Sequence, residues 1–506
     1  MRYAAPAHGQ KNTLEFHEPT DLGHSGLGLA APRKSPVGPR LCHLMWERLG
    51  ALPVCEGESR MKDLHGNAVT GATGAALEKF NAAIEAFGVY RDDPLALLDA
   101  AIAEAPAFVA AHLAKAIMLG LMTEPAGRDA AIMVLGGTRE MAMNAREASL
   151  AEAVGFLLEG EWSAAARRLD QHSMSYPHDL LALQAGHLID FFRAHARELR
   201  DRIARALPAW SPDMPHYALL LGMHAFGLEE CGDYDRAEEA GRRALALDRR
   251  DCWAHHAVAH VMEMQGRAED GVGWMIAREA DWAGEDNFFQ VHNWWHRGLF
   301  HLALEQNDAA LGLYDAHVGA MLNGIAVNLV DASALLWRLH LCGCDVGARW
   351  REVARQWEAV ADGALYPFND WHAVMADLGA EQHDLLAARI ARMRRAAAGS
   401  GETAAWIRDF GLPLVNGFVA FWRGDDRQAV ETLYAVRFIA NAFGGSHAQR
   451  DVIDWTLGEA AVRAGMRDLA TALAHERLAL KPFNPLNHDL LQRARGAVPA
   501  VPGKGR

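Results

Sequence analysis

Two short segments carry the residues best suited to chemistry, "CWAHHAVAHVMEMQGR" at 252–267 and "FFQVHNWWHRGLFHL" at 288–302. Each contains an HxxxH pair, His256 with His260 and His292 with His296. Residues four apart on a helix project from one face, about one turn apart. Imidazoles at this spacing can ligate a divalent metal, carry protons near neutral pH, or hydrogen-bond a ligand. What the two pairs do therefore depends on the elements that position them.

The surrounding chain repeats one helical unit. "GEWSAAARRLDQHSMSYPHD" (160–179), "GDYDRAEEAGRRALALDRRD" (232–251) and "GMRDLATALAHERLALKPFN" (465–484) each begin with Gly and have Ala at the sixth residue. Weaker copies start at Gly266, Glu305, Gly343, Gly379 and Gly424. Spacings of 34 to 45 residues from Gly232 onward are typical of stacked helical hairpins. The units resemble the tetratricopeptide (TPR) repeat: in the unit that starts at Asp451, the residues on positions 7, 8, 20 and 32 are Leu457, Gly458, Ala470 and Pro482.

This pattern predicts an all-α fold of TPR-like helical-hairpin repeats stacked into a right-handed superhelix, an α-solenoid. We expect nine or ten hairpins from about residue 75 to 495, within a single domain over 61–495, with the first helix of each hairpin lining the concave groove. Residues 1–60 mix Pro, Gly, His and Ser without periodicity, which indicates a disordered extension or a start assigned too early. Residues 496–506 are expected to form a flexible tail.

Composition limits the classes of partner. The chain has 506 residues, is 51% hydrophobic, and carries a net charge of −14 without long basic runs. These features argue against a nucleic-acid partner or an anionic membrane surface and favour a peptide or small-molecule ligand. Six scattered cysteines indicate a reducing compartment, and the absence of a signal segment or an apolar run long enough to cross a bilayer predicts a cytoplasmic protein.

The repeat register assigns the histidines to a surface. With Gly266 at position 15, His256, His260 and Glu263 share the face of the first helix that lines the groove in TPR proteins. In the next unit Trp294 and Gly298 set the register, which places His292 and Trp295 in the same groove and His296 at its border. Since neighbouring first helices lie on the order of 10 Å apart, the two pairs are expected to converge. The neighbouring histidines His255 and His301 are expected to point elsewhere on their helices.

Three interpretations of this cluster stay open. The histidines are polar filling of a wet groove, or they bind a peptide or small ligand together with Glu263 and Trp295, or they form a metal or acid/base centre. In the third case the metal ligands would be His256, His260, His292 and His296, and zinc or iron suits a nitrogen and oxygen ligand set. Candidate catalytic residues would then be His256, His260, Glu263 and His292.

A more specific resemblance extends from about Lys62 to Arg495. The ordered segments "AHHAVAHVMEMQGR", "VHNWWHRGLF", "LYDAHV", "LLWRLHLCGCDVGARW", "PFNDWHAVMADLG", "GGSHAQRDV" and "LALKPFNPLN" are similar to the tetratricopeptide repeat protein 38 family. The resemblance implies the TPR fold and implies no particular reaction. It carries over the following positions: His256, His260, Glu263, His292, Trp295, His296, Asn369, Asp370, His372, Arg450 and Asp451.

The later positions have expected roles of their own. Asn369 faces the groove if Gly379 occupies position 15, with Asp370 and His372 nearby, and Asp370 is expected to cap structure rather than relay protons to His372. Arg450 either offers a fork to an anionic ligand or forms an ion pair between repeats. Asp451 is expected at a helix start, as an N-terminal carboxylate.

The leading functional hypothesis is a TPR superhelical binding or interaction protein with a histidine-rich ligand site in its groove. The alternative is a metal-dependent or His/Glu-assisted enzyme, in one version a hydrolase, that acts on a small or peptide-like substrate in the same groove.

Overall fold

A computed structural model describes residues 61–439 and 444–496, and these residues belong to one compact unit. The segment expected to be disordered, 1–60, and all of the expected tail except Gly496 lie outside the described residues.

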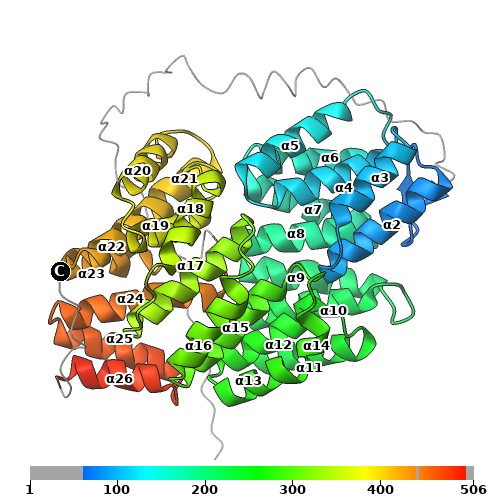
Figure 1. Ribbon diagram of the computed structural model, residues 1–506. Coiled ribbons are helices and arrows are strands. Elements are labelled where there is room, and N and C mark those ends of the chain that lie inside the picture. Colours follow the sequence, from blue (N-terminus) through cyan, green and yellow to red (C-terminus); the bar gives the residue numbers. More distant parts are fainter. Residues whose placement is uncertain (1–60, 440–443, 497–506) are drawn as a thin grey trace, which may run out of the picture. The chain divides into compact units, whose positions relative to one another are not determined.

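The described part of the chain is helical almost throughout, as expected for an all-α protein (Figure 1). The one described sheet is a hairpin of β1 (Met61–Lys62) and β2 (Ala68–Val69). The first half contains α2 (Gly74–Val89), α3 (Pro94–Glu104), α4 (Val109–Gly120), α5 (Pro125–Gly137), α6 (Ala145–Leu158), α7 (Trp162–Ser175), α8 (Leu180–Phe192), α9 (Ala196–Ala206), α10 (Tyr217–Glu230) and α11 (Tyr234–Leu247). The second half contains α12 (Cys252–Met264), α13 (Ala268–Ala277), α14 (Glu279–Trp282), α15 (Gln290–Ala303), α16 (Asn307–Leu313), α17 (Ala326–Leu341), α18 (Arg349–Val360), α19 (Pro367–Gly379), α20 (His383–Ala397), α21 (Glu402–Trp406), α22 (Leu412–Trp422), α23 (Asp426–Val436), α24 (His447–Arg463), α25 (Arg467–Leu480) and α26 (Pro485–Ala494).

Tight turns with a left-handed residue join most helices into pairs. The repeated glycines of the sequence occupy these turns: Gly160, Gly232, Gly266, Gly343, Gly424 and Gly465 all have φ between 67° and 80°. Glycine adopts this backbone conformation without the steric penalty that a Cβ imposes. Between α15 and α16 the residue is Glu305, as the spacing predicted. Between α19 and α20 it is Glu381 rather than the predicted Gly379, which ends α19.

Two helix pairs share a buried ion pair that the sequence repeats as D-x11-R-I-A-R. Arg202 of α9 donates to Asp190 of α8 at 2.7 Å, and Arg389 of α20 donates to Asp377 of α19 at 2.9 Å. In each case a second guanidinium nitrogen donates to a backbone carbonyl, so the buried charge is both paired and hydrogen-bonded. These interactions join the two helices of a pair at equivalent positions.

Segments far apart in the sequence also meet. The Asn369 amide donates to the Thr123 carbonyl at 3.0 Å, and the Tyr366 hydroxyl donates to the Phe192 carbonyl at 3.0 Å. Lys481, which follows α25, pairs with Glu263 of α12 at 2.6 Å. Helices from both halves of the chain therefore enclose a common interior. Among the described residues, no helix is long and apolar enough to cross a membrane.

Candidate metal centre

Four histidines from two neighbouring helices converge in this interior. His256 and His260 come from α12, and His292 and His296 come from α15. The Nε2 of His292 lies 3.0 Å from the Nε2 of His256 and 3.2 Å from that of His296. One ligand nitrogen from each ring lies within 4.8 Å of the other three. Nitrogens bound to one tetrahedral ion at 2.0–2.1 Å would be separated by about 3.3 Å, so the observed spacing fits a metal centre.

Carboxylates stand behind two of these rings. The Nδ1 of His292 lies 2.9 and 3.0 Å from the two oxygens of Asp331 in α17. The Nδ1 of His260 lies 3.4 Å from Glu229 at the end of α10. A carboxylate that accepts the Nδ1 proton leaves the Nε2 lone pair free for a metal and fixes the orientation of the ring. Asp331 makes this hydrogen bond, whereas Glu229 lies near His260 without forming one.

Burial keeps the histidines in the form that ligates. Burial, followed by the charges of neighbouring histidines, holds the pKa of both His256 and His296 well below the usual value. Burial also lowers the pKa of His260 to about 4. All three rings are therefore neutral at physiological pH, and a neutral imidazole is the form that binds metals.

Several polar atoms of the cluster have no hydrogen-bond partner in the protein. Both nitrogens of His260 and the Nδ1 atoms of His256 and His296 are buried in this state. A buried polar atom without a partner costs roughly 1–3 kcal/mol, so these unpaired nitrogens are costly if the rings serve only as polar filling. Hydrogen bonds among tautomers can satisfy the two close Nε2 contacts but leave the Nε2 of His260 unpaired. A cation coordinated by all four rings would satisfy every Nε2.

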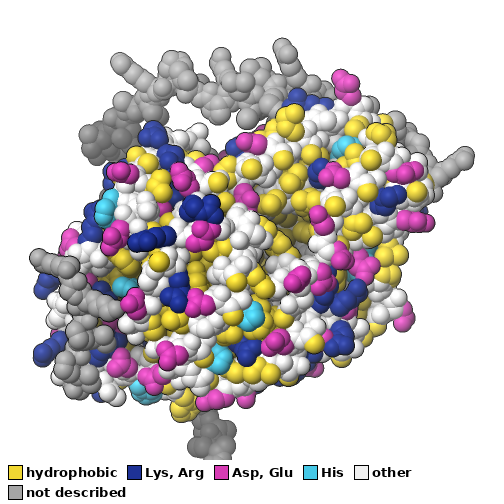
Figure 2. Space-filling view, viewed as in Figure 1, with side chains coloured by type: hydrophobic (Ala, Val, Ile, Leu, Met, Phe, Trp, Pro, Cys, Tyr) yellow, Lys and Arg dark blue, Asp and Glu magenta, His cyan; other side chains and the backbone are white. Residues whose placement is uncertain are grey.

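The cluster forms part of the wall of a large cavity. The cavity holds about 490 Å³, and His256, His292 and Asp331 line it, whereas His260 and His296 lie behind them. The rest of the wall comes from the ends of α2, α4 and α8 and from the starts of α15, α17, α19 and α24. Figure 2 shows hydrophobic side chains gathered near the middle of the face in view, between α4 and α8 on one side and α17 on the other.

The structure corrects two predicted groove residues. Glu263 lies away from the four histidines and pairs with Lys481, because the turn after α25 packs over this end of α12. Trp295 is fully buried and does not line the cavity, so it cannot stack on a ligand there. Its ring instead stacks on His292 at 5.2 Å, and the Arg338 guanidinium of α17 lies over it. The register placed His296 at the border of the groove, but the structure places it within the cluster.

The two excluded histidines lie where the face argument placed them. His255 is buried and stacks on Trp274 with ring centroids 5.5 Å apart, away from the other rings of α12. The Nδ1 of His301 hydrogen-bonds Gln306 at 2.7 Å. Neither belongs to the group of nitrogens that could share an ion.

The predicted site residues of α19 differ in their positions relative to the cavity. Asn369 lines the cavity with its amide bonded to Thr123. Asp370 accepts from the Gly363 backbone at 2.8 Å, which is a structural contact, and burial raises its pKa to about 7. The Nδ1 of His372 bonds the Phe368 carbonyl, and the ring lies outside the cavity wall.

Arg450 and Asp451 are structural as well. Arg450 is buried, donates to the backbone carbonyls of Gly444 and Gly445, and lies 3.6 Å from Glu230, so it forms the contact between repeats rather than a fork for an anion. Ser446, not Asp451, caps α24. Asp451 lies one turn into the helix and pairs with Arg477 at 2.9 Å.

The sequence argument missed Asp331 and Glu229. Asp331 occurs in the apolar run "AVNLVDASALLW", and an unpaired acid on a buried helix is a signal for a buried partner. Its partner His292 is 39 residues away on another helix, so no local spacing reveals the pair. Glu229 is followed by Glu230 at the end of α10, where a pair of acids is also typical of a solvated helix end.

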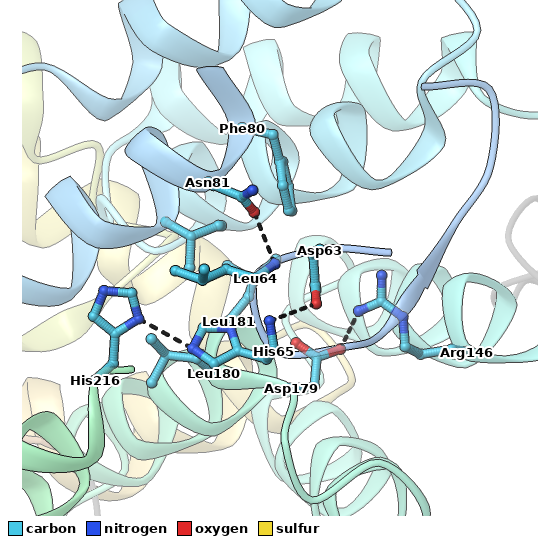
Figure 3. Close-up of a pocket in the computed structure, with 11 residues that line it drawn as sticks. Asp63, Leu64, His65, Phe80, Asn81, Arg146, Asp179, Leu180, Leu181 and His216 are labelled. Atoms are coloured by element: carbon cyan, nitrogen blue, oxygen red, sulfur yellow. Dashed lines mark hydrogen bonds and ion pairs between the residues drawn. The ribbon is translucent and has the colours of Figure 1, made fainter. Parts of the chain in front are cut away.

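A second group of titratable residues near the β1–β2 hairpin does not form a comparable site (Figure 3). His65 and His216 lie 3.0 Å apart, and Asp179 pairs with Arg146 and with His172. The space they enclose is about 10 Å³, enough for about one water molecule. These contacts join the hairpin to α6 and to the start of α8, and the small space between them leaves no room for a larger ligand. No known family model matches the chain.

Proposed function

We propose that this protein binds one divalent transition-metal ion through His256, His260, His292 and His296 and uses it to hold a small molecule in the adjoining cavity. The observation that carries the proposal is the convergence of four imidazoles, with Asp331 behind one of them, on the wall of a largely apolar cavity. A cavity of about 490 Å³ has the size of a typical small-molecule site.

The ligand set indicates which metals fit. Imidazole suits zinc, iron, copper and nickel, and the absence of thiolate from the cluster argues against a soft-metal site. Zinc bound by all four rings would form a closed, structural centre. An ion that accepts five or six ligands, such as Fe(II), would keep a coordination position toward the cavity beside His256 and His292. We therefore propose iron ahead of zinc.

The scaffold of this site is proposed to be a TPR-like superhelix of the tetratricopeptide repeat protein 38 family. The paired helices, their left-handed glycine turns and the repeated Arg–Asp pairs support the repeat architecture. A cytoplasmic location belongs to the same proposal and is supported by the free thiols of Cys231, Cys252, Cys342 and Cys344.

A metal-dependent enzyme is the second candidate. It is favoured by the position of His292, which reaches the cavity and is hydrogen-bonded to Asp331. A metal ion at that position would act as a Lewis acid toward a carbonyl in the cavity or lower the pKa of a bound water. Turnover of the cavity ligand on the metal-loaded protein would distinguish this candidate from binding alone.

Elemental analysis tests the metal proposal. Protein purified without a chelator or a histidine tag should contain about one transition-metal ion per chain. His296→Gln should lose most of this metal while keeping its helical circular dichroism, and His301→Gln should retain it. A stoichiometry near zero that is not restored by Fe(II) or Zn(II) would reject the proposal.

A further inference from the structure

The cavity and the histidine cluster together indicate the class of ligand. We infer that the ligand is a monocarboxylate with an extended apolar body, bound with its carboxylate on the metal ion and its body along the cavity. This inference rests on the proposed metal site and adds the chemistry of the molecule that reaches it.

The wall of the cavity is the first argument. Its volume of about 490 Å³ falls within the roughly 300–1,000 Å³ typical of small-molecule sites. Aromatic and aliphatic side chains form most of the wall, including Phe87, Met118, Leu188, Phe191, Phe289 and Val330. Burying apolar ligand surface against such a wall is favourable in proportion to the area removed from water. The body of the ligand should therefore be hydrocarbon.

Most polar side chains elsewhere in the wall are already engaged, whereas the Tyr90 hydroxyl and the Trp253 indole nitrogen are buried without a hydrogen-bond partner. Asn369 donates to Thr123, Gln449 accepts from the backbone of Ser446 and Asp93 accepts from the backbone of Ala96. The Arg91 guanidinium pairs with Asp286. A polar group on the body of the ligand would have to break one of these interactions, because desolvation without a partner is costly. The metal is thus the main polar anchor that the cavity offers.

The charge at the proposed metal site indicates which head group the ligand carries. A divalent ion held by four neutral imidazoles carries two positive charges, and Asp331, when it accepts the Nδ1 proton of His292, contributes one negative charge. Imidazole ligands bring no negative charge of their own, and Glu230, the next acid beside His260, is paired with Arg450 at 3.6 Å. The ion therefore places positive charge beside a largely apolar cavity. A single carboxylate would neutralise it, whereas an alcohol would not.

The guanidinium of Arg338, near the cluster, also favours an anionic head group. Arg338 is buried in α17, and its guanidinium donates to the carbonyls of Ala334, Ala448 and Gln449 rather than directly to a carboxylate. Its charge lies over the ring of Trp295, which in turn stacks on His292. The acids around the cluster have partners of their own: Glu230 pairs with Arg450, Asp451 with Arg477 and Glu263 with Lys481. The field at the cluster therefore favours an anion.

The test uses the full chain loaded with Co(II), whose visible spectrum reports a change of ligand. Decanoate is titrated in parallel with decan-1-ol, which has the same body without the charge, and with acetate, which has the head without the body. We expect decanoate to change the cobalt spectrum and to bind at least tenfold more tightly than either, with a tenfold or greater loss on metal-free protein.

A pair of variants separates the cavity from the metal. Leu188→Trp adds a ring at the cavity wall and should weaken decanoate binding at least tenfold while cobalt stoichiometry stays at one per chain. Ile132→Trp adds the same ring at an exposed position of α5 and should change neither quantity. Cobalt bound at one per chain, with decanoate binding no tighter than decan-1-ol or leaving the spectrum unchanged, would overturn the inference and leave the metal site standing. Failure to bind cobalt would overturn both, and the separate metal measurement identifies this case.

Discussion

Replacing Asp331 by Asn tests whether the carboxylate behind His292 prepares that ring for a metal. The two Asp331 oxygens lie 2.9 and 3.0 Å from the Nδ1 of His292, and the carboxylate is buried. The Asn side chain has nearly the same shape but loses the charge and can present its amide nitrogen to the ring. Comparable changes behind a metal-bound histidine cost about 10- to 100-fold in metal affinity, or about 1.4–2.7 kcal/mol.

The same substitution should not weaken the metal-free fold. Burial raises the pKa of Asp331 above its usual value despite the opposing effect of His292, which means that desolvation destabilises the ionised carboxylate. Replacing it with a neutral amide removes that cost. The melting temperature of metal-free Asp331→Asn should therefore equal or exceed that of the unmodified protein.

Competition with a chelator of known affinity measures the effect. Asp370→Asn is the matched control, because it removes another buried carboxylate that contacts the backbone of Gly363 and no histidine of the cluster. We expect Asp331→Asn to lose one to two decades of metal affinity and Asp370→Asn to lose none. Equal metal affinity in both variants, or a large fall in the melting temperature of metal-free Asp331→Asn, would show that Asp331 is structural and refute this reasoning.

Three further predictions follow from the same contacts. Because burial lowers the pKa of His260 to about 4, the unfolded chain binds more protons than the folded protein below about pH 6.5. The free energy of unfolding of the metal-free protein should therefore be greatest above that pH and fall by about 2 kcal/mol per such ring by pH 5. Urea titrations of His260→Gln should show a shallower fall. An unchanged pH slope would contradict the assignment. Arg389→Ala leaves Asp377 buried without its partner and should cost about 3–5 kcal/mol in the free energy of unfolding. Arg355→Ala, at an exposed pair, should leave the free energy of unfolding nearly unchanged. His255→Ala should lower the melting temperature, because the ring stacks on Trp274, without changing metal affinity per folded molecule. A loss of metal affinity in this variant would show that His255 also belongs to the metal site.

Helical spacing and the glycine turns made much of the fold predictable. Unit starts recurring every 34 to 45 residues, all glycines except Glu305, indicated the turns of helix pairs, and a left-handed residue lies at each of these starts or within two residues of it. The turn at Ala194 between α8 and α9 was not indicated in this way. The i, i+4 spacing also identified the histidines of α12 and α15 that converge. Both inferences depend only on helical spacing between residues that are close in the sequence.

Contacts between distant helices were not predictable in this way. The repeat register could not show that Lys481 would cover Glu263, or that α17 would bring Asp331 to His292 and Arg338 over Trp295. The repeat register also did not show that residues from Ala86 to Gln449 would line one cavity. Such contacts depend on how many repeats meet in space, and no single repeat encodes that.

X-ray absorption at the edge of the co-purified metal tests the central claim most directly. Four or more nitrogen or oxygen ligands at about 2.0–2.2 Å, with the outer-shell scattering of several imidazoles, is the result that the proposed centre predicts. In His292→Gln the imidazole contribution should fall. A first shell containing sulfur, or a spectrum that is the same in His292→Gln, would place the metal elsewhere and contradict the assignment of this cluster.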